Sequence, residues 1–242
     1  MLKQQTVALF DLDYTLLEAD SEALWCSHLF NQGVVDVGFM AGIEAFYWQY
    51  KDETIDLRSY QEFLLAPLVQ NPLAEMLRLR QDYLEWVRDV ARPEMLERVS
   101  LHRSQNHTLV MITAANSFVA EPIAQMLGFP NLICTKLEVS NGNFTGKVSG
   151  IPAFQYGKVI HLAAWLREKK LSLAGSWFYS DSHNDLPLLK LVDHPVMVGP
   201  DSLLQQYGLE RGWETFEGGD KQTQTGRDGA PDSNHRQLFP SV

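Results

Sequence analysis

Short apolar segments that end in polar residues, separated by helical patterns, constrain the fold of this chain most strongly. Thr6–Phe10 (TVALF) is followed at once by the acidic segment Asp11-Leu12-Asp13, the pattern of a buried strand with polar residues at its carboxyl end. Helical patterns that alternate with such segments predict an α/β core built on a parallel sheet. The other predicted strands are Leu109–Ile112, Leu132–Cys134, Ser176–Tyr179 and Val196–Val198.

The connection between the first two predicted strands is far longer than a simple βα connection and has no strand pattern. Asp20 or Ser21 is predicted to cap a first helix in it, and Asp56 another. Asn71-Pro72 is predicted to begin a longer helix, with Asn71 as the cap and proline at the first position. The predicted division is a core of residues 1–17 and 92–216, an inserted α-helical cap of residues 18–91, and a tail of residues 217–242.

Two segments depart from the alternation of strands and helices. Residues 136–150 contain Asn141-Gly142 between two strand-like stretches, which is a hairpin signal. Residues 217–242 are rich in Gly, Asp, Gln, Ser and Thr, which predicts a disordered tail.

Composition excludes several classes of function. The 242 residues carry a formal net charge of −10, which argues against a general nucleic-acid binder or a protein of anionic membrane surfaces. No signal-peptide pattern and no apolar run of about 18 residues is present. Cys26 and Cys134 are far apart in apolar surroundings, so we expect two buried thiols in a reducing compartment and not a disulfide. The expected location is the cytoplasm.

Asp11 and Asp13 are the first candidate site. Two carboxylates spaced i, i+2 at a strand end can both turn towards the crevice where open α/β sheets bind ligands. Two anions this close need a shared proton or a cation, and Mg²⁺ prefers carboxylate and carbonyl oxygens. The alternative is an acidic loop that caps the following helix.

Two further candidates would bind phosphate oxygens. Thr113 ends the second predicted strand, where a hydroxyl near a helix start can hold an anion, although a turn or cap role is the commoner explanation of such a hydroxyl. Lys158 stands at a helix start, which the helix dipole disfavours. That position makes sense if the ammonium reaches an anionic site, and the alternative is a solvated lysine.

The segment after the fourth predicted strand repeats the carboxylate pattern. Asp181 could be a metal ligand from a neighbouring strand, and Asn184 and Asp185 could orient the ligands. His183 is more simply explained as a surface or supporting histidine than as a catalytic base.

In this order, the four elements resemble the haloacid dehalogenase superfamily of aspartate-nucleophile hydrolases. The helical insertion resembles its phosphoserine phosphatase branch, and Ile112–Ile123 (ITAANSFVAEPI) is similar to a subgroup with histidinol-phosphatase-like enzymes. The resemblance covers about residues 5–205 and implies a Rossmann-like core. Phosphoserine phosphatases tend to have serine and glycines where Thr113-Ala114-Ala115 stands, which weakens the case for phosphoserine as the substrate.

The resemblance implies a Mg²⁺-dependent phosphatase. Asp11 would be the nucleophile that forms an aspartyl-phosphate, and Asp13 would protonate the leaving group and then take a proton from water. The other implied roles are Mg²⁺ binding by the Asp11 and Asp181 carboxylates and the Asp13 carbonyl, phosphate binding by Thr113 and Lys158, and support from Thr15, Asn184 and Asp185.

The expected partner is a small phosphomonoester, with histidinol phosphate first and phosphoserine behind it. Asp20 and Ser21 stand where this branch often reads the leaving group, and Asp20 could pair with a substrate ammonium. Glu18 and Glu22 are alternatives for that role, and a helix cap explains Asp20 equally well.

Three other functions compete with the phosphatase. A phosphotransferase would use the same intermediate and pass the phosphoryl group to an alcohol. A non-catalytic module would bind a phosphorylated ligand. A dehalogenase would need neither Asp13 nor a metal. The oligomeric state is not predicted.

Overall fold

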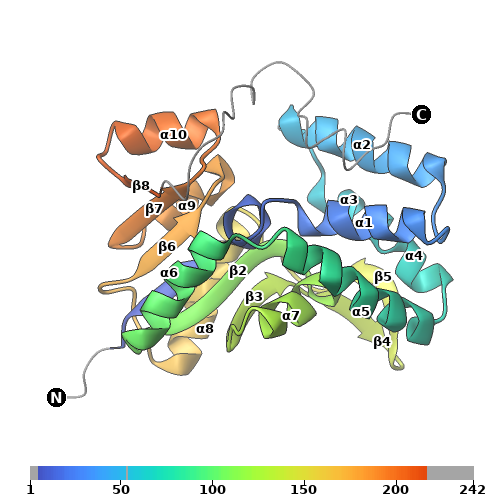
Figure 1. Ribbon diagram of the computed structural model, residues 1–242, viewed down its shortest axis with the longest axis horizontal. Helices are drawn as coiled ribbons and strands as arrows, with labels where there is room; N and C mark the ends of the chain where they lie inside the picture. Colours follow the sequence, from blue (N-terminus) through green and yellow to red (C-terminus); the bar gives the residue numbers. More distant parts are fainter. Residues whose placement is uncertain (1–4, 53, 217–242) are drawn as a thin grey trace.

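The computed structural model describes residues 5–52 and 54–216. Within these residues, a six-stranded sheet has the order β3-β2-β1-β6-β7-β8 (Figure 1). All of its pairings are parallel, so the predicted α/β fold with a Rossmann-like parallel sheet is confirmed. The strands are β1 (Val7–Phe10), β2 (Thr108–Asn116), β3 (Asn131–Thr135), β6 (Trp177–Ser180), β7 (His194–Val198) and β8 (Glu214–Phe216).

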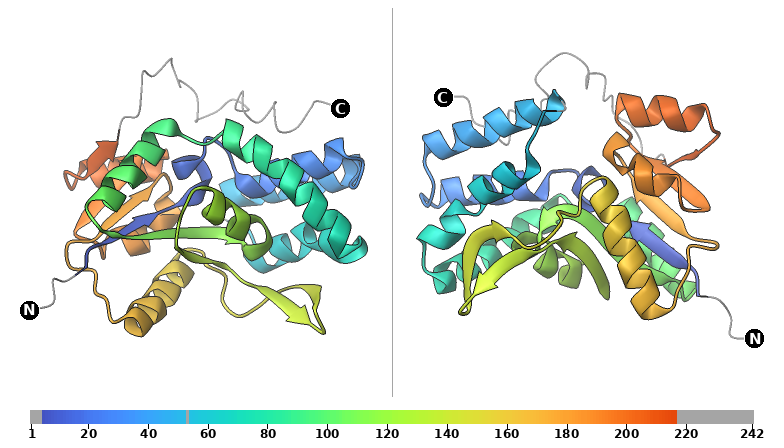
Figure 2. Two further views of the ribbon diagram at one scale, coloured as in Figure 1. Left: turned by 60° about the horizontal axis from the view of Figure 1, so that its bottom comes forward. Right: turned by 180° about the vertical axis from the view of Figure 1, so that it is seen from behind.

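Helices cover both faces of the sheet, which explains the continuous apolar run in β1. Ala8 and Phe10 face one layer, which contains α6 and α7, whereas Val7 and Leu9 face α8, α9 and α10. Figure 2 shows α6 and α8 on opposite faces. These helices are α6 (Pro93–Ser104), α7 (Ser117–Met126), α8 (Tyr156–Lys169), α9 (Leu186–Leu189) and α10 (Ser202–Leu209).

Five of the helices in the described residues lie between Leu17 and Ala91, within the connection from β1 to β2. The chain leaves and re-enters the core at one crossing, where Leu17 pairs with Ala91 and the Glu18 N–H donates to Val90 O at 2.8 Å. The predicted cap boundaries, 18 and 91, lie at this crossing. The helices are α1 (Ser21–Asn31), α2 (Val37–Lys51), α3 (Leu57–Leu64), α4 (Ala66–Gln70) and α5 (Leu73–Asp89).

The predicted caps of two of these helices are confirmed, and a third is wrong. Asp20 accepts from the N–H of Ala23 at the start of α1, and Asp56 caps α3. The cap position of α5 is Pro72 and not Asn71. The Asn71 side chain instead donates to the carbonyl of Pro67 at 2.8 Å, so it closes the end of α4.

Helix α2 was not predicted because it has no single apolar stripe. Met40 packs into a cluster of buried residues, and Ile43 contacts both that cluster and a cavity. Phe46, Tyr47 and Tyr50 line the same cavity. Apolar and aromatic side chains therefore face two directions, which hides the periodicity of an amphipathic helix.

The predicted hairpin is confirmed. β4 (Leu137–Ser140) and β5 (Asn143–Val148) pair antiparallel, and both Asn141 and Gly142 have positive φ, 51° and 81°, as a two-residue hairpin turn requires. β5 packs against α3 and α4, so the hairpin lies beneath the inserted helices (Figure 1).

Cys26 and Cys134 are buried free thiols, as predicted. None of the helices in the described residues has the length and apolar character needed to span a membrane. The predicted tail, residues 217–242, lies outside the described residues.

A buried histidine links α6 to the sheet. His102 is 3% exposed, and its Nε2 lies 2.9 Å from the Tyr179 hydroxyl while its Nδ1 lies 2.7 Å from Nδ1 of His107. Burial first, and then the neighbouring His107 and Arg98, together lower the pKa of His102 to about 4. The ring is therefore held neutral in the folded protein.

We predict that His102 makes the protein less stable in acid. Its pKa is lower in the folded than in the unfolded chain, so the unfolded state binds more protons between pH 6.5 and about 4. The neutral ring makes its full contribution to the free energy of unfolding above pH 6.5. About 3 kcal/mol of that contribution is lost as the pH falls to about 4. Urea unfolding of the wild type and His102→Gln across this range should show a difference that shrinks with acidification; parallel curves would contradict the assignment.

Candidate active site

The carboxyl ends of β1, β2 and β6 meet at a cavity between the sheet and the inserted helices. Asp11, Asp13 and Asp181 line it from the sheet side, and Tyr47 and Tyr60 from the inserted helices. Its volume is about 200 Å³, which suits a small molecule rather than a polymer. The other lining residues are Tyr14, Asp20, Glu22, Ala23, Ile43, Phe46, Tyr50, Ile55, Leu57, Gln61, Ala114, Ala115, Phe154, Lys158, Ser182, Asn184 and Asp185.

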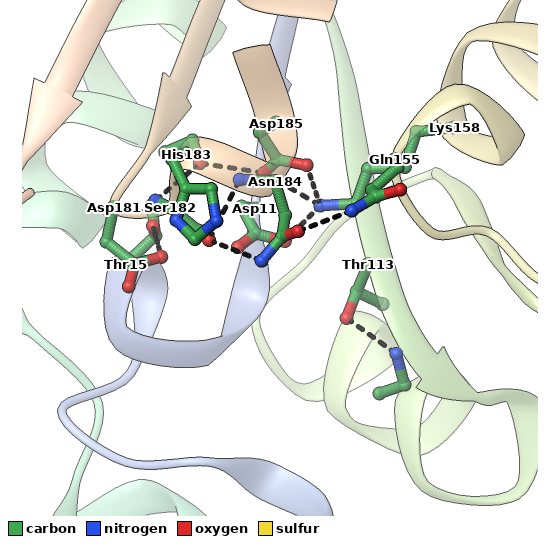
Figure 3. Close-up of polar contacts among 12 residues, drawn as sticks. Asp11, Thr15, Thr113, Gln155, Lys158, Asp181, Ser182, His183, Asn184 and Asp185 are labelled. Carbon is green, nitrogen blue, oxygen red and sulfur yellow. Dashed lines mark hydrogen bonds and ion pairs between the residues drawn. The ribbon is translucent and has the colours of Figure 1, made fainter. Parts of the chain in front are cut away.

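Lys158 is the centre of the polar contacts at this edge of the sheet (Figure 3). Its Nζ lies 2.8 Å from Asp11 Oδ1 and 2.8 Å from a carboxylate oxygen of Asp185. The Ser180 hydroxyl donates to Asp185 at 2.7 Å. The predicted anionic environment of Lys158 is present, although its first partners are protein carboxylates.

Burial and charge set the protonation of these groups. Burial raises the pKa of Asp11 to about 6, although the ammonium of Lys158 opposes this shift. Burial alone would lower the pKa of Lys158, but Asp11 and Asp185 raise it above its ordinary value. Lys158 is therefore a fixed positive charge beside the predicted nucleophile.

Asp13 lies in the tight turn Leu12–Leu16 that follows β1. Tyr14 in this turn has φ 55°, and the Asp13 Oδ1 accepts from the N–H of Ser21 at 2.7 Å. Burial, then the charges of Asp20 and Asp11, raise the pKa of Asp13 well above its usual range. A carboxyl with a raised pKa is better suited to act as a general acid than an ordinary aspartate.

Asp181 follows β6, the strand beside β1. It is 8% exposed, and its Oδ1 accepts from the Thr15 hydroxyl at 3.3 Å. Thr15 therefore contacts Asp181, one of the carboxylates that the resemblance implies as Mg²⁺ ligands.

The charge balance of the cavity fits a divalent cation. Among the described residues, no three His, Cys, Asp or Glu side chains converge as a metal-binding group. The predicted ligand set, however, has only two carboxylates, Asp11 and Asp181, with the backbone carbonyl of Asp13. Of the described residues that line the cavity, Lys158 alone is basic, whereas six are acidic: Asp11, Asp13, Asp20, Glu22, Asp181 and Asp185. Mg²⁺ with its retained waters suits such an oxygen-rich, negatively charged site.

Thr113 lies apart from this group (Figure 3). It is buried, and its hydroxyl oxygen accepts from the Ala115 N–H at 3.0 Å, while Ala114 and Ala115 line the cavity. Strand β2 also continues past the predicted end at Ile112, because it runs to Asn116, which caps α7. Phosphate binding by Thr113 itself stays a prediction.

The predicted specificity residues differ in their placement. Asp20 both caps α1 and lines the cavity. Ser21 is buried and holds Asp13 through its N–H, but its side chain is not among the lining groups.

A polar chain that the sequence analysis missed joins the inserted helices to the sheet. The Gln155 side chain donates to Asn184 Oδ1 at 2.7 Å, and Asn184 Nδ2 donates to the Tyr50 hydroxyl at 2.9 Å. Gln155 has φ 48° and ψ −119°, a strained conformation for a residue with a side chain. Asn184 thus contacts α2, while Asp185 holds Lys158. No local pattern could have paired these positions, which come from three separate segments.

Comparison with known proteins places the site in a family. The haloacid dehalogenase-like hydrolase family matches residues 8–190. Histidinol-phosphatase from Neisseria meningitidis serogroup C (strain 8013) is 35% identical over 86% of this chain and 97% of its own. Phosphoserine phosphatase SerB1 from Mycobacterium tuberculosis is 30% identical over 86% of this chain and 69% of its own.

Solved structures share the fold. A Bordetella pertussis Tohama I protein of unknown function has a TM-score of 0.83 at 32% identity, covering 89% of this chain and 99% of its own. A substrate-bound phosphoserine phosphatase has a TM-score of 0.64 at 14% identity, covering 84% and 90%. The second likeness shows the fold alone.

We predict that Lys158→Met destabilises the protein by about 3 kcal/mol, because it leaves buried carboxylates without their counter-charge. Lys169→Met is the matched control on the same helix. The Lys169 side chain is 46% exposed beside Glu168, so its loss should cost less than about 0.5 kcal/mol. Urea unfolding at pH 7 measures both, and equal effects would show that the buried ion pairs do not stabilise the fold.

Proposed function

The chain belongs to the haloacid dehalogenase-like hydrolase family and is a phosphatase, and we propose that it cleaves a small phosphomonoester with Mg²⁺ as cofactor through an aspartyl-phosphate on Asp11. The observation that carries the proposal is Lys158 held between Asp11 and Asp185. Asp13 and Asp181 line the same cavity. All four predicted carboxylates thus gather where parallel strands end.

The reaction has two displacements. A carboxylate oxygen of Asp11 attacks phosphorus, the bond between phosphorus and the ester oxygen breaks, and Asp13 gives its proton to the departing oxygen. Water then attacks phosphorus, Asp13 takes a proton from it, and inorganic phosphate leaves as the Asp11 carboxylate is restored. The raised pKa of Asp13 supports both proton transfers.

Binding groups surround the phosphoryl position. Asp11, Asp181 and the Asp13 carbonyl would hold Mg²⁺, which when bound offsets the repulsion between nucleophile and phosphate. Lys158 supplies a positive charge beside Asp11. Thr113 accepts from the Ala115 N–H and so helps to fix the Ala114-Ala115 segment that lines the cavity. The inserted helices over the cavity limit the access of bulk water.

Histidinol phosphate is the proposed substrate. The Neisseria relative of that name aligns over 97% of its length. The cavity offers aromatic walls, including Phe46, Tyr47 and Tyr60, for a planar imidazole, and acidic side chains on α1 and at its start for an ammonium. Phosphoserine is the second candidate because SerB1 is also a relative, and a phosphotransferase would share the intermediate.

We predict that phosphate release from histidinol phosphate requires both Mg²⁺ and Asp11. Asp11→Asn should lower kcat by about 10³-fold or more, because it removes the nucleophile. Asp82→Asn, at an exposed position that pairs with Arg78, should keep the wild-type rate. The assay is phosphate release from a panel of phosphomonoesters with and without Mg²⁺.

The other outcomes distinguish the phosphatase from the competing functions. Activity retained by Asp11→Asn would exclude it as the nucleophile. Phosphoryl transfer to an added alcohol in preference to water would favour the phosphotransferase, and binding without turnover of any ester would favour the non-catalytic module.

A further inference from the structure

Glu22 is a buried carboxylate in the cavity wall whose hydrogen-bond partners are all neutral amides. It is 5% exposed. Its Oε1 accepts from Gln61 Nε2 at 3.0 Å and from the Asn116 N–H and Nδ2 at 2.8 and 2.7 Å. Its Oε2 accepts from Gln61 Nε2 alone, also at 3.0 Å. No Lys, Arg or His of the described chain forms an ion pair with it, so its charge is uncompensated.

The amide of Gln61 points to a missing donor. A carboxylate can only accept, so the two contacts from Nε2 to Glu22 fix the orientation of the Gln61 amide. Gln61 Oε1 is then a buried acceptor with no hydrogen-bond partner among the described residues. Gln61 is 1% exposed and lines the cavity, and an unsatisfied buried acceptor is costly. A ligand with N–H donors would satisfy it.

The surroundings favour a cation at this position. Burial, reinforced by Asp20, raises the pKa of Glu22 to about 7, which shows how poorly its charge is stabilised without a ligand. Phe46 and Tyr60 line the same cavity with ring centroids 5.4 Å apart, and aromatic faces attract cations.

Among the described residues, the cavity has no free basic side chain that could pair with a carboxylate on a ligand. Of the described residues that line it, Lys158 is the only base, and it is engaged by Asp11 and Asp185. Arg58 does not line the cavity and donates to the carbonyl of Gly150. A carboxylate on the leaving group would therefore face further anions without a free counter-charge.

We propose that Glu22 and Gln61 receive a protonated amine on the leaving group of the substrate, and that the cavity thereby selects amino-alcohol phosphates over amino-acid phosphates. An ammonium has three donors, which match the open capacity of Glu22 Oε2 and Gln61 Oε1. The inference rests on the proposed phosphatase function of the same cavity and names its substrate class. It assigns the amine to Glu22, leaving Asp20 as the cap of α1.

The test compares two esters that differ in the amine alone. We would measure kcat/KM for histidinol phosphate and its deamino analogue with the wild type, Glu22→Gln and Glu18→Gln. Glu22→Gln should reduce the preference for the amine about 10- to 100-fold, the range for a charge-assisted hydrogen bond. Glu18 is exposed and lies outside the cavity, so Glu18→Gln should leave that preference unchanged.

A double variant separates recognition from architecture. Glu22→Gln with Gln61→Glu exchanges the two groups, so the hydrogen bonds to Asn116 and between positions 22 and 61 can still form and the carboxylate stays in the wall. This variant should recover part of the amine preference. Equal losses on both esters in Glu22→Gln, with no recovery in the exchange, would show that Glu22 only holds the segments together and would overturn the proposal.

Two further measurements complete the design. Phosphoethanolamine and phosphoserine differ in one carboxylate, and turnover of phosphoserine as efficient as that of phosphoethanolamine would overturn the selectivity.

Calorimetric binding of histidinol phosphate and its deamino analogue to Asp11→Asn with Mg²⁺ tests the amine site without turnover. If binding shows a Glu22-dependent preference for the amine but the wild type releases no phosphate, the phosphatase function is contradicted and the amine site is supported. If binding shows no such preference, the amine site is contradicted.

Discussion

The ammonium of Lys158, buried between Asp11 and Asp185, is the interaction on which the rest of the site depends. Each carboxylate follows a different central strand, so their closeness results from the parallel order of β1 and β6. Without a cation, two buried carboxylates at this edge would repel each other and bind protons. Lys158 reaches them from the first turn of α8, where the helix dipole opposes its charge. The ion pairs offset that cost, and the hydrogen bond from the Gln155 side chain to Asn184 anchors the loop before α8.

The parts of this structure that could be predicted from sequence are those in which chemistry and local pattern coincide. TVALF followed by Asp11-Leu12-Asp13 reads as a strand end because both faces of a central strand are buried, and the strand is fully covered by helices. Asp20 and Asp56 could be assigned as caps because an N-cap acts within a few residues. Strand ends of one parallel sheet share an edge, so Asp181 could be placed near Asp11 from order alone.

Contacts between distant segments could not be predicted in the same way. Gln61 and Asn116 meet at Glu22 from α3 and from the end of β2, and Tyr50 meets Asn184 from α2. Their sequence positions hold no periodicity or motif that joins them. Asn71 shows a related limit, because its side chain could serve either of two adjacent helices, and the bond to Pro67 decides between them. The strand β8 has only three residues, none of them fully buried, so it leaves no strand pattern in the sequence.

The position of Glu22 connects substrate recognition to the placement of the inserted helices. Its carboxylate lies on α1, is held by Gln61 of α3, and reaches Asn116, directly after the Ala114-Ala115 segment that lines the cavity. A ligand cation bound to Glu22 would therefore strengthen the contact between the inserted helices and the part of the site that binds phosphate. Binding energy from a part of the substrate remote from phosphorus would then help to hold the catalytic groups in place, so an ester without the amine should lose turnover as well as affinity. On this argument the amine contributes to kcat and not only to KM, because it stabilises the arrangement in which Asp13, anchored by the Ser21 N–H of α1, faces the leaving group.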